Sequence, residues 1–567
     1  MALTESSSAS PVQNAQKTHK TFLDHLKDAG SLTLHHAKRH IGMGLICSVA
    51  YFDPGNWGVD LQAGSEFGYR LLFVVLLAGI FAVFLQVLAS RLGTVTGLDL
   101  ASHNRMLLYN RPKHTLLYRY LGLYPLYVLA EVAIVATDLA ELLGSAIALC
   151  MLFPSLELWH GVLITTFDVI LILALGDPLR GKPVRGFEIL IGAMVLAVLV
   201  CMVIIITKVN VHWGDAFIGY LPSKYIFAKG GVYTSVGILG ATVMPHSLFL
   251  GSALATQDRV SFYDRSGNKS DALDEAISTS SKSMSPGRAI FQRWLNGMKE
   301  GVLKAFRTPT DERKPTRYSE RSNNCYEFVK AHIYHGTFDI AGSLLGFAVM
   351  INSLILMLAA AVFYGQRGED AAPASLFDAY DLINEMVGKG AATIFAIALL
   401  SAGQSSSIVA TVAGQAVCEG FLDWRVSPIF RRLLTRLLAL IPSMVVAIAV
   451  GRSGIDALLV ASQVVLSICL PFVTFPLLWC TSSKAIMSVK CTTSPSPDDA
   501  TSTSKMEIEE KAGDVGASNS DDIEGETASA NTVDYSNNKL TIAFGGAIWL
   551  LVVAANVYVL VELGMDA

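Results

Sequence analysis

Long apolar runs recur along this chain, and a polar segment separates each run from the next. A helix needs about 20 apolar residues to cross the hydrocarbon core of a bilayer, and most of the runs approach that length. The runs lie at about 43–67, 70–92, 121–152, 159–176, 186–207, 232–256, 338–364, 391–419, 433–451, 455–480 and 540–563. The pattern therefore predicts an all-α integral membrane protein with 11 transmembrane helices.

The first and sixth runs differ from the others because polar residues and helix breakers interrupt them. The interruptions are residues 53–56 (Asp-Pro-Gly-Asn) and 241–246 (Ala-Thr-Val-Met-Pro-His). Lipid cannot satisfy a free backbone group, so a broken helix survives only where it lines a cavity enclosed by protein. The two breaks are five spans apart, and this odd offset reverses the second unit across the membrane. Such inverted repeats carry a substrate site between two discontinuous helices near the midplane.

The polar segments set the boundaries of this organisation. We expect one five-helix repeat at 41–210 and its inverted counterpart at 231–256 plus 333–480. The other segments are an N-terminal tail at 1–40, a loop at 257–332, an acidic loop at 481–538 that we expect to be disordered, and a last helix at 539–567. Lys and Arg cluster before the first run and in three later loops, so the positive-inside rule predicts a cytoplasmic N-terminus and cytoplasmic long loops.

Composition supports this picture and excludes several classes of protein. The chain is 52% hydrophobic and 16% charged, with a mean hydropathy of +0.47, whereas soluble domains carry about 25% charged residues. The eight cysteines form no CxxC pair, which argues against a disulfide scaffold or a zinc module. No Ser/His/Asp combination or HExxH string appears. We therefore expect neither an enzyme, nor a cofactor, nor a nucleic-acid partner.

The residue types at the two breaks suit a transition-metal ion. Asp53 would carry charge at membrane depth, which is costly and usually functional, and the amide oxygen of Asn56 is only three residues away. Met244 adds a thioether, which favours transition metals over Mg²⁺ or Ca²⁺. The carbonyls of Ala50 and Ala241 end the first half-helices and would attract a cation. The alternative is that the Pro-Gly kink is structural and Met244 fills the core.

A second set of polar residues suggests a route for protons. Glu131, Asp138 and Glu141 share one face of the third span, and a face with three carboxylates is not expected to contact lipid. Neighbouring cations could tune their pKa values. The candidate cations are Arg431, Arg432 and Arg436 of the ninth span. His246 titrates near neutral pH and could join the route; it could equally be a helix cap, and Arg431 and Arg432 could simply mark the inner edge of the membrane.

Seven ordered motifs together resemble the Nramp family of proton-coupled divalent-metal transporters. They lie at 48–56, 60–64, 91–97, 136–141, 240–246, 402–406 and 462–464, and the resemblance covers about residues 40–480 and the last helix. Residues 56–58 and 248–257 are similar to those of fungal members.

The resemblance implies a LeuT-type fold, with two inverted five-helix repeats plus one extra helix. It implies that Asp53, Asn56 and Met244 are side-chain metal ligands, and that Ala50 and Ala241 are carbonyl ligands in different transport states. It adds Gln463, which joins the ligand set in some states. The proton route would use His246, Glu131, Asp138 and Glu141, near Arg431, Arg432 and Arg436. Gly251 stands where many members have a second histidine, which puts that part of proton coupling in doubt.

We therefore predict a secondary transporter that moves Mn²⁺ or Fe²⁺ into the cytosol with H⁺ by alternating access. Cd²⁺, Co²⁺ and Zn²⁺ are further substrates to be expected of such a site. The rival hypotheses are a metal-permeable channel and a Mg²⁺ carrier of the same family. We expect a monomer in the plasma membrane, with an endosomal or vacuolar membrane as the alternative.

Overall fold

A computed structural model describes residues 42–174, 179, 185–259, 318, 321–364, 374–423, 427–449, 452–490 and 532–566. The predicted N-terminal tail at 1–40 lies outside these residues, as do most of the predicted loop at 257–332 and the middle of the predicted loop at 481–538.

The described chain is helical apart from one short ribbon, and its helices begin and end as follows. The first half contains α2 Met43–Val49, α3 Pro54–Phe67, η1 Gly68–Leu71, α4 Leu72–Thr96, α5 Leu100–Leu108, α6 Thr115–Tyr118, η2 Arg119–Leu123, α7 Tyr124–Leu152, α8 Leu158–Ala174, α9 Arg185–Ile206, α10 Trp213–Gly219, η3 Lys224–Phe227, α11 Gly231–Thr242 and α12 Pro245–Leu254. The second half contains α15 Tyr326–Ser343, η5 Leu344–Val349, α16 Met350–Phe363, α17 Leu376–Met386, α18 Lys389–Leu422, α19 Pro428–Ala449, α20 Arg452–Ser482, α21 Lys484–Met487, β1 Ser488–Lys490, β2 Thr532–Asp534 and α22 Lys539–Asp566.

Eight helical stretches among the described residues are long and apolar enough to cross a membrane. One of them, Pro54–Thr96, has 43 residues and would be about 65 Å long if it were straight. This is twice the hydrocarbon thickness of about 30 Å. It contains α3, η1 and α4, and it therefore accounts for parts of two predicted spans, which meet at Gly68 with φ +61°. Shorter apolar helices, 158–167 and 433–449, lie at the predicted fourth and ninth spans.

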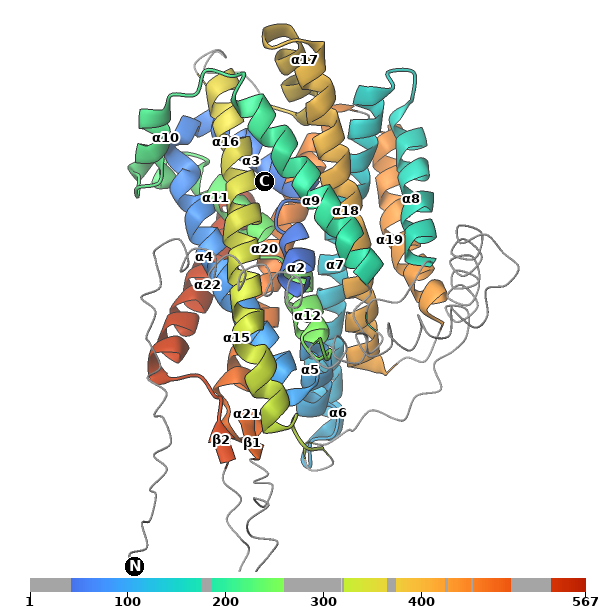
Figure 1. The fold of residues 1–567 in the computed structure, drawn as a ribbon, viewed down its shortest axis with the longest axis vertical. Helices are drawn as coiled ribbons and strands as arrows, with labels where there is room; N and C mark the ends of the chain where they lie inside the picture. The colour runs from blue at the N-terminus through green and yellow to red at the C-terminus, as the bar shows by residue number, and fades with distance from the viewer. Residues whose placement is uncertain are drawn as a thin grey trace, which may run out of the picture.

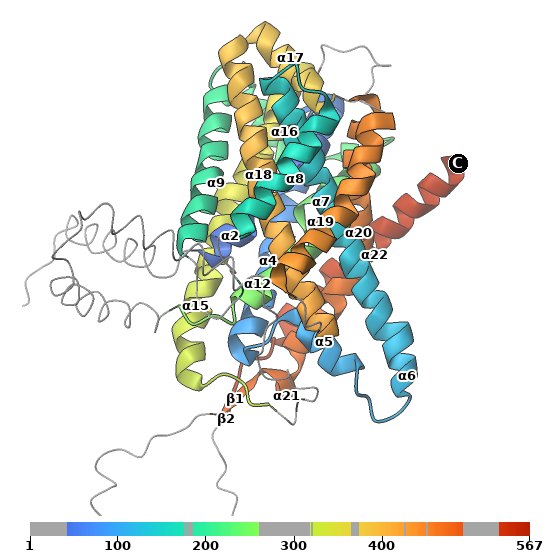
Figure 2. The ribbon, with the colours of Figure 1, turned by 90° about the vertical axis from the view of Figure 1, so that its right-hand side faces the viewer.

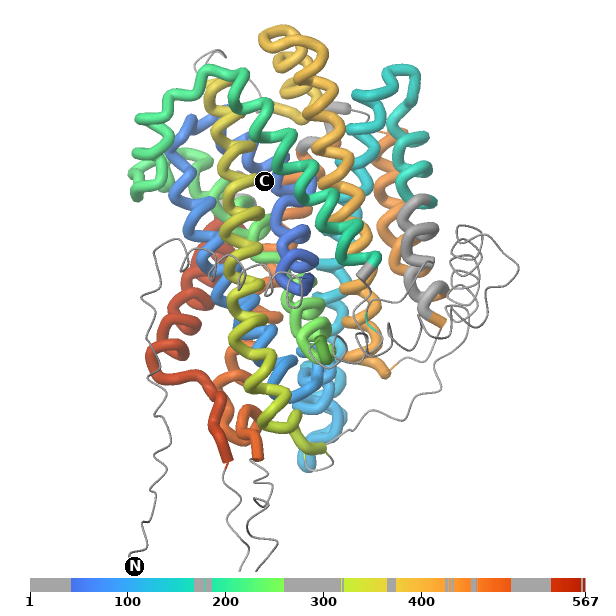
Figure 3. Tube along the Cα trace, viewed as in Figure 1, coloured from blue at the N-terminus to red at the C-terminus, as the bar shows by residue number. Residues whose placement is uncertain are grey.

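The two broken helices lie in the middle of the bundle. The first consists of α2 and α3, and the second consists of α11 and α12 (Figure 1). α3 packs against α11, α16 and α20, while α12 packs against α2, α4 and α18. Figure 2 shows α8, α9 and α19 on the outside of the bundle and α22 diverging from it at one side. Figure 3 traces the same backbone as a tube, and the residues at both breaks are buried.

Two predicted boundaries need correction. The seventh span was predicted at 338–364, but its helix begins at Tyr326 and so includes the end of the predicted loop at 257–332. Charged and histidine residues lower the hydropathy of this first part without preventing a helix. The predicted disordered loop at 481–538 is ordered at both ends, where β1 and β2 pair in antiparallel fashion with Val489 opposite Val533. Val489 is fully buried in the apolar core, which helps to hold the ribbon in place.

Candidate metal centre

The first break exposes one carboxylate oxygen to the centre of the bundle. α2 ends at Val49, Ala50 is its C-cap, and α3 begins at Pro54, whose fixed φ suits the first position of a helix. Asp53 is the N-cap of α3, and its Oδ1 accepts a hydrogen bond of 2.9 Å from the backbone N–H of Asn56. This cap fixes the orientation of the carboxylate. Asp53 Oδ2 is buried and has no hydrogen-bond partner among the described residues.

Oxygens from both breaks converge on one nitrogen. Asn56 Nδ2 donates to Asp53 Oδ1 at 2.6 Å and to the carbonyl oxygen of Ala241 at 2.9 Å. Ala241 lies at the end of α11, 185 positions along the chain from Asn56. A carboxylate from the first break and a carbonyl from the second therefore face the same point. Carboxylate and carbonyl oxygens are ligand types that bind divalent cations, so these two could form part of a coordination shell.

Gln463 of α20 lies between the two broken helices. A Cβ built on Gly55 of the first break would clash with the side-chain amide of Gln463 and would lie 3.1 Å from Asp53 Oδ2. A Cβ built on Gly240 of α11 would clash with the backbone carbonyl of Gln463. Because both glycines lack a side chain, both helices reach α20 closely. The Gln463 side-chain oxygen is buried and has no partner in the described part of the chain.

Met244 belongs to the second break. It is the residue before Pro245, which begins α12, and it follows Ala241 by three positions. Its side chain is completely buried. Its carbonyl oxygen lies 3.0 Å from Ser247 Oγ.

The donor set differs from that of a resident metal cofactor. Within the described residues there is no group of three or more His, Cys, Asp or Glu side chains that could hold a metal. One carboxylate, amide oxygens, backbone carbonyls and a thioether are present instead. Asp53, Asn56, Met244 and Gln463 each have an exposed fraction of at most 1%. Water therefore does not reach them in this conformation.

Sequence reasoning missed Asn352 of α16, which supports the first break. Its Nδ2 donates to the carbonyl oxygen of Tyr51 at 2.7 Å and to Asn56 Oδ1 at 3.2 Å, while its own Oδ1 is buried without a partner among the described residues. The only sign of this role in the sequence was that Asn352 is an amide within the apolar run at 338–364.

A polar cluster beside the breaks was also missed, and it fills the space opposite Gly251. The Tyr51 hydroxyl donates to Gln86 Oε1 at 2.9 Å, and Ser247 Oγ donates to the Tyr51 hydroxyl at 2.7 Å. Gln86 Nε2 donates to Cys47 Sγ at 3.3 Å. A Cβ on Gly251 would clash with Gln86 Nε2. Gln86 therefore occupies the volume that a side chain at this position would need.

Two further buried carboxylates lie close enough to repel the charge of Asp53. They are Asp60, two helical turns later on α3, and Glu141 of α7. Neither oxygen of Glu141 makes a well-formed hydrogen bond within the described chain, although the Ser406 hydroxyl lies beside them. Removing Asp53 would therefore also change the field at Glu141.

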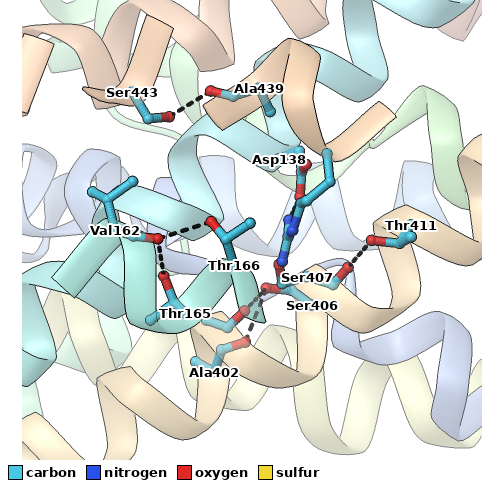
Figure 4. A network of polar contacts seen from close by, with 12 residues as sticks. Asp138, Val162, Thr165, Thr166, Ala402, Ser406, Ser407, Thr411, Ala439 and Ser443 are labelled. Carbon is cyan, nitrogen blue, oxygen red and sulfur yellow. Dashed lines mark hydrogen bonds and ion pairs between the residues drawn. The ribbon is translucent and has the colours of Figure 1, made fainter. Parts of the chain in front are cut away.

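A buried ion pair joins α7 to α19. Arg436 pairs with Asp138, and the guanidinium also donates to Ser407 Oγ of α18. Figure 4 shows this network, with Ser406 and Ser407 side by side on α18 and Asp138 facing them. Ser406, beside Glu141, and Ser407, bound to Arg436, are neighbours on α18, so Glu141 and Asp138 face the same part of that helix.

The remaining predicted proton residues have different surroundings. His246 of α12 is buried; its Nδ1 lies 3.3 Å from Thr137 Oγ1, and its Nε2 has no partner among the described residues. Glu131 is half-buried beside Tyr127, about two turns before Asp138. Arg431 and Arg432 lie on α19, but their side chains fall outside the described residues.

The residues and geometry of the site agree with the comparison to known protein families. The family model described as natural resistance-associated macrophage protein-like, or Nramp, matches residues 44–285 and 315–494. The chain belongs to the Nramp family. This Nramp chain is 39% identical over 530 residues to the manganese transporter pdt1 of Schizosaccharomyces pombe, covering 93% of this chain and 85% of that protein.

Two further similarities extend the comparison. The chain is 36% identical over 540 residues to the iron transporter SMF3 of Saccharomyces cerevisiae, covering 93% of this chain and 97% of that protein. A crystal structure of the manganese transporter of Eremococcus coleocola superposes with a TM-score of 0.62 at 27% identity, covering 91% of this chain and 85% of that one. The predicted fold class, the LeuT-type fold of Nramp transporters, is confirmed. The prediction that the chain is not an enzyme is also confirmed, because the relatives are transporters.

Proposed function

We propose that this Nramp chain is a secondary transporter that moves Mn²⁺ or Fe²⁺ into the cytosol together with protons. The observation that carries the proposal is the convergence of Asp53 Oδ1 and the Ala241 carbonyl on Asn56 Nδ2. Two broken helices bring a carboxylate and a carbonyl to one point. The names of the fungal relatives, manganese and iron transporters, support the choice of metal.

The metal would be held by groups that are already buried. Asp53 Oδ2 and the Gln463 side-chain amide both lie over Gly55, and neither Asp53 Oδ2 nor Gln463 Oε1 has a hydrogen-bond partner among the described residues. When the Asn56 amide turns its oxygen toward this space, the ion takes over the position between the converging oxygens. The Met244 thioether would then favour Mn²⁺, Fe²⁺, Cd²⁺, Co²⁺ or Zn²⁺ over Ca²⁺ and Mg²⁺.

The burial of the site supports alternating access. The ligand side chains are shielded from water, so the ion can enter and leave only when the half-helices move. A channel would instead need a continuous hydrated path through the bundle. The buried carboxylates near the breaks support proton coupling: Glu141 lies close enough to Asp53 to feel its charge, Asp138 pairs with Arg436, and His246 lies beside Thr137.

The membrane context follows from the charge pattern. We propose a multi-pass protein whose N-terminus is cytoplasmic, because Lys and Arg gather in alternate loops. We take the plasma membrane as its location, with an endosomal or vacuolar membrane as the alternative. All proposed ligands come from one chain, so a monomer is sufficient for transport.

Proton-driven Mn²⁺ uptake into proteoliposomes tests the proposal. We expect Asp53→Asn to reduce uptake at least about 10-fold, which corresponds to ~1.4 kcal/mol of lost ion binding. Asp381→Asn, in an exposed outer helix, is the matched control and should transport like the wild type. Normal uptake by Asp53→Asn protein would reject the proposed site.

The two rival functions predict different results in the same assay. A channel would carry Mn²⁺ at a rate that does not depend on an inward proton gradient. A Mg²⁺ carrier would show equal competition by Mg²⁺ and Fe²⁺ against Mn²⁺. We expect gradient-dependent uptake that excess Fe²⁺ inhibits and excess Mg²⁺ does not.

A further inference from the structure

An apolar groove on the outer surface of the bundle has no role in the metal centre. It has a volume of about 850 Å³ and lies between α5 and the start of α7 on one side and α20 and α22 on the other. A second hollow of about 510 Å³ adjoins it, between α20 and α22. Figure 2 shows α22 leaning away from the bundle on this side.

An aromatic ridge divides the two hollows. Phe475, Trp479 and Trp549 line both of them. The ring centroids of Phe475 and Trp479 are 6.3 Å apart, and those of Phe475 and Trp549 are 5.9 Å apart. Trp549 Nε1 donates to the carbonyl of Pro471 at 2.9 Å, which locks one ring. Two adjoining apolar hollows that share an aromatic wall fit a molecule with two hydrocarbon chains.

One end of the groove is basic. Arg111 lines it, and its Nε donates to the carbonyl of Leu107 at 2.6 Å, which leaves the terminal N–H groups of the guanidinium available. Lys113, two residues after Arg111, is exposed. Arg119 Nε donates to the Tyr109 carbonyl at 2.7 Å. A ligand that fills the groove would therefore meet the donors of Arg111.

The basic end lies at the level of lipid headgroups. The continuous helix Thr115–Leu152 has 38 residues and is about 57 Å long, so it extends beyond a hydrocarbon core of about 30 Å. Its first turns expose apolar residues between the basic ones, a combination typical of the membrane interface. These exposed residues are Leu116, Leu117, Tyr120 and Leu121.

We propose that the two hollows bind an anionic glycerophospholipid of the adjacent leaflet. Its acyl chains lie on either side of the Phe475–Trp479–Trp549 ridge, and its phosphate pairs with Arg111. The positive-inside pattern predicts that this is the cytoplasmic leaflet, whose anionic lipids are attracted to basic segments. The bound lipid bridges α7, which carries Asp138 and Glu141, to α20, which carries Gln463.

Purified full-length protein allows a direct test by native mass spectrometry and thermal melting with defined lipids. We expect phosphatidylserine to raise the melting temperature by several degrees more than phosphatidylcholine does, and to remain bound in the mass spectrum. Arg111→Gln should abolish this preference while phosphatidylcholine still binds. Lys490→Gln, an exposed base of the ribbon, is the charge control and should keep the preference.

A second pair of variants tests the groove itself. Gly122→Phe fills it, and a Cβ at Gly122 meets only the Leu108 side chain at ordinary contact distance. Gly346→Phe is the matched control. Gly122 lies in the π-helical turn η2, and Gly346 lies in the π-helical turn η5 with open space around it. Gly122→Phe should lose the bound lipid and Gly346→Phe should keep it. Equal stabilisation of the wild type by both lipids, or unchanged lipid binding by both Arg111→Gln and Gly122→Phe, would overturn the proposal.

Discussion

Asp53 has two separate tasks, one for each carboxylate oxygen. Oδ1 caps α3 and accepts from Asn56, and Oδ2 is left without a partner among the described residues. An unpaired buried oxygen costs free energy of about 1–3 kcal/mol in an ordinary protein core. At a transport site, the arriving cation removes that cost.

The Met244 thioether should determine selectivity more than rate. We expect Met244→Ala to retain part of the Mn²⁺ uptake and to lose discrimination against Ca²⁺, because the remaining oxygen ligands suit Ca²⁺ as well. Competition of Ca²⁺ with Mn²⁺ in proteoliposomes measures this. Met202→Ala removes an equally buried methionine from α9 and should leave selectivity unchanged. If Met244→Ala still excluded Ca²⁺, the thioether would not be the source of selectivity.

The Asp138–Arg436 pair should couple stability to proton transport. Arg436→Gln leaves Asp138 buried without its cation, which typically costs about 3–5 kcal/mol. We expect a lower melting temperature and weaker dependence of Mn²⁺ uptake on the proton gradient. The double variant Asp138→Asn/Arg436→Gln should recover much of the melting temperature but not the gradient dependence. Recovery of both would assign the pair a purely structural role.

The two broken helices keep their positions because small residues let neighbouring helices approach them. A Cβ on Gly144 of α7 would clash with the ring of Pro54, and a Cβ on Gly403 of α18 would lie 3.3 Å from the same ring. The neighbours thus hold the first break from two sides. Pro54 cannot move away without shifting Asp53, its neighbour in the chain.

Filling the space beside Pro54 should therefore disturb the ion site. We expect Gly144→Ala to cost about 1–3 kcal/mol of stability through overpacking and to weaken Mn²⁺ binding. Calorimetric titration with Mn²⁺, together with thermal melting, measures both effects. Gly342→Ala on α15 has open space around it and should behave like the wild type. Wild-type affinity in Gly144→Ala would show that the break tolerates displacement.

The sequence predicted the breaks well because a Pro-Gly string or a Met-Pro string inside an apolar run is seldom compatible with an unbroken helix. It predicted Asp53, Asn56 and Ala241 as neighbours, and the structure places them in one hydrogen-bonded group. It did not predict Asn352 or Gln86, because a single amide in an apolar helix does not reveal which neighbour it faces. Nor did hydropathy locate the start of α15 at Tyr326, since helices extend past the bilayer without becoming more apolar.

At the scale of the whole molecule, hydrogen bonds fasten the segment before α15 to the end of α4 and to α5, which are distant in the sequence. Arg321 donates to the carbonyls of Thr96 and Gly97 at 2.8 and 2.7 Å, and Asn324 donates to the Thr94 carbonyl. Tyr318 lies 2.9 Å from His103 Nδ1. The chain before α15 is thus fastened to the end of α4 and to α5.

His103 should make the stability of this part of the fold, around α5, depend on acid pH. Its ring is buried in α5, and burial lowers its pKa to about 4, compared with about 6.5 in unfolded chains. The folded state therefore favours the neutral ring. The stability that this preference adds to the free energy of unfolding is complete above pH 6.5. It is lost as the pH falls toward 4, and the loss is about 3 kcal/mol at most. We expect the melting temperature to fall between pH 6.5 and 4 less steeply in His103→Gln than in the wild type. His114→Gln, at an exposed position, is the control, and equal slopes in all three proteins would contradict the prediction.

The β1–β2 ribbon has a practical consequence. Lys490 and Thr532 face each other across the ribbon, and Arg91 of α4 donates to the Tyr535 carbonyl at 2.9 Å just beyond it. The two strand ends are therefore close together and anchored to a helix of the bundle. A rigid fiducial domain whose own termini are adjacent could therefore replace residues 491–531. It would be displayed at a fixed angle to the bundle. Such a domain would give particles of this small membrane protein a landmark for alignment in electron cryomicroscopy.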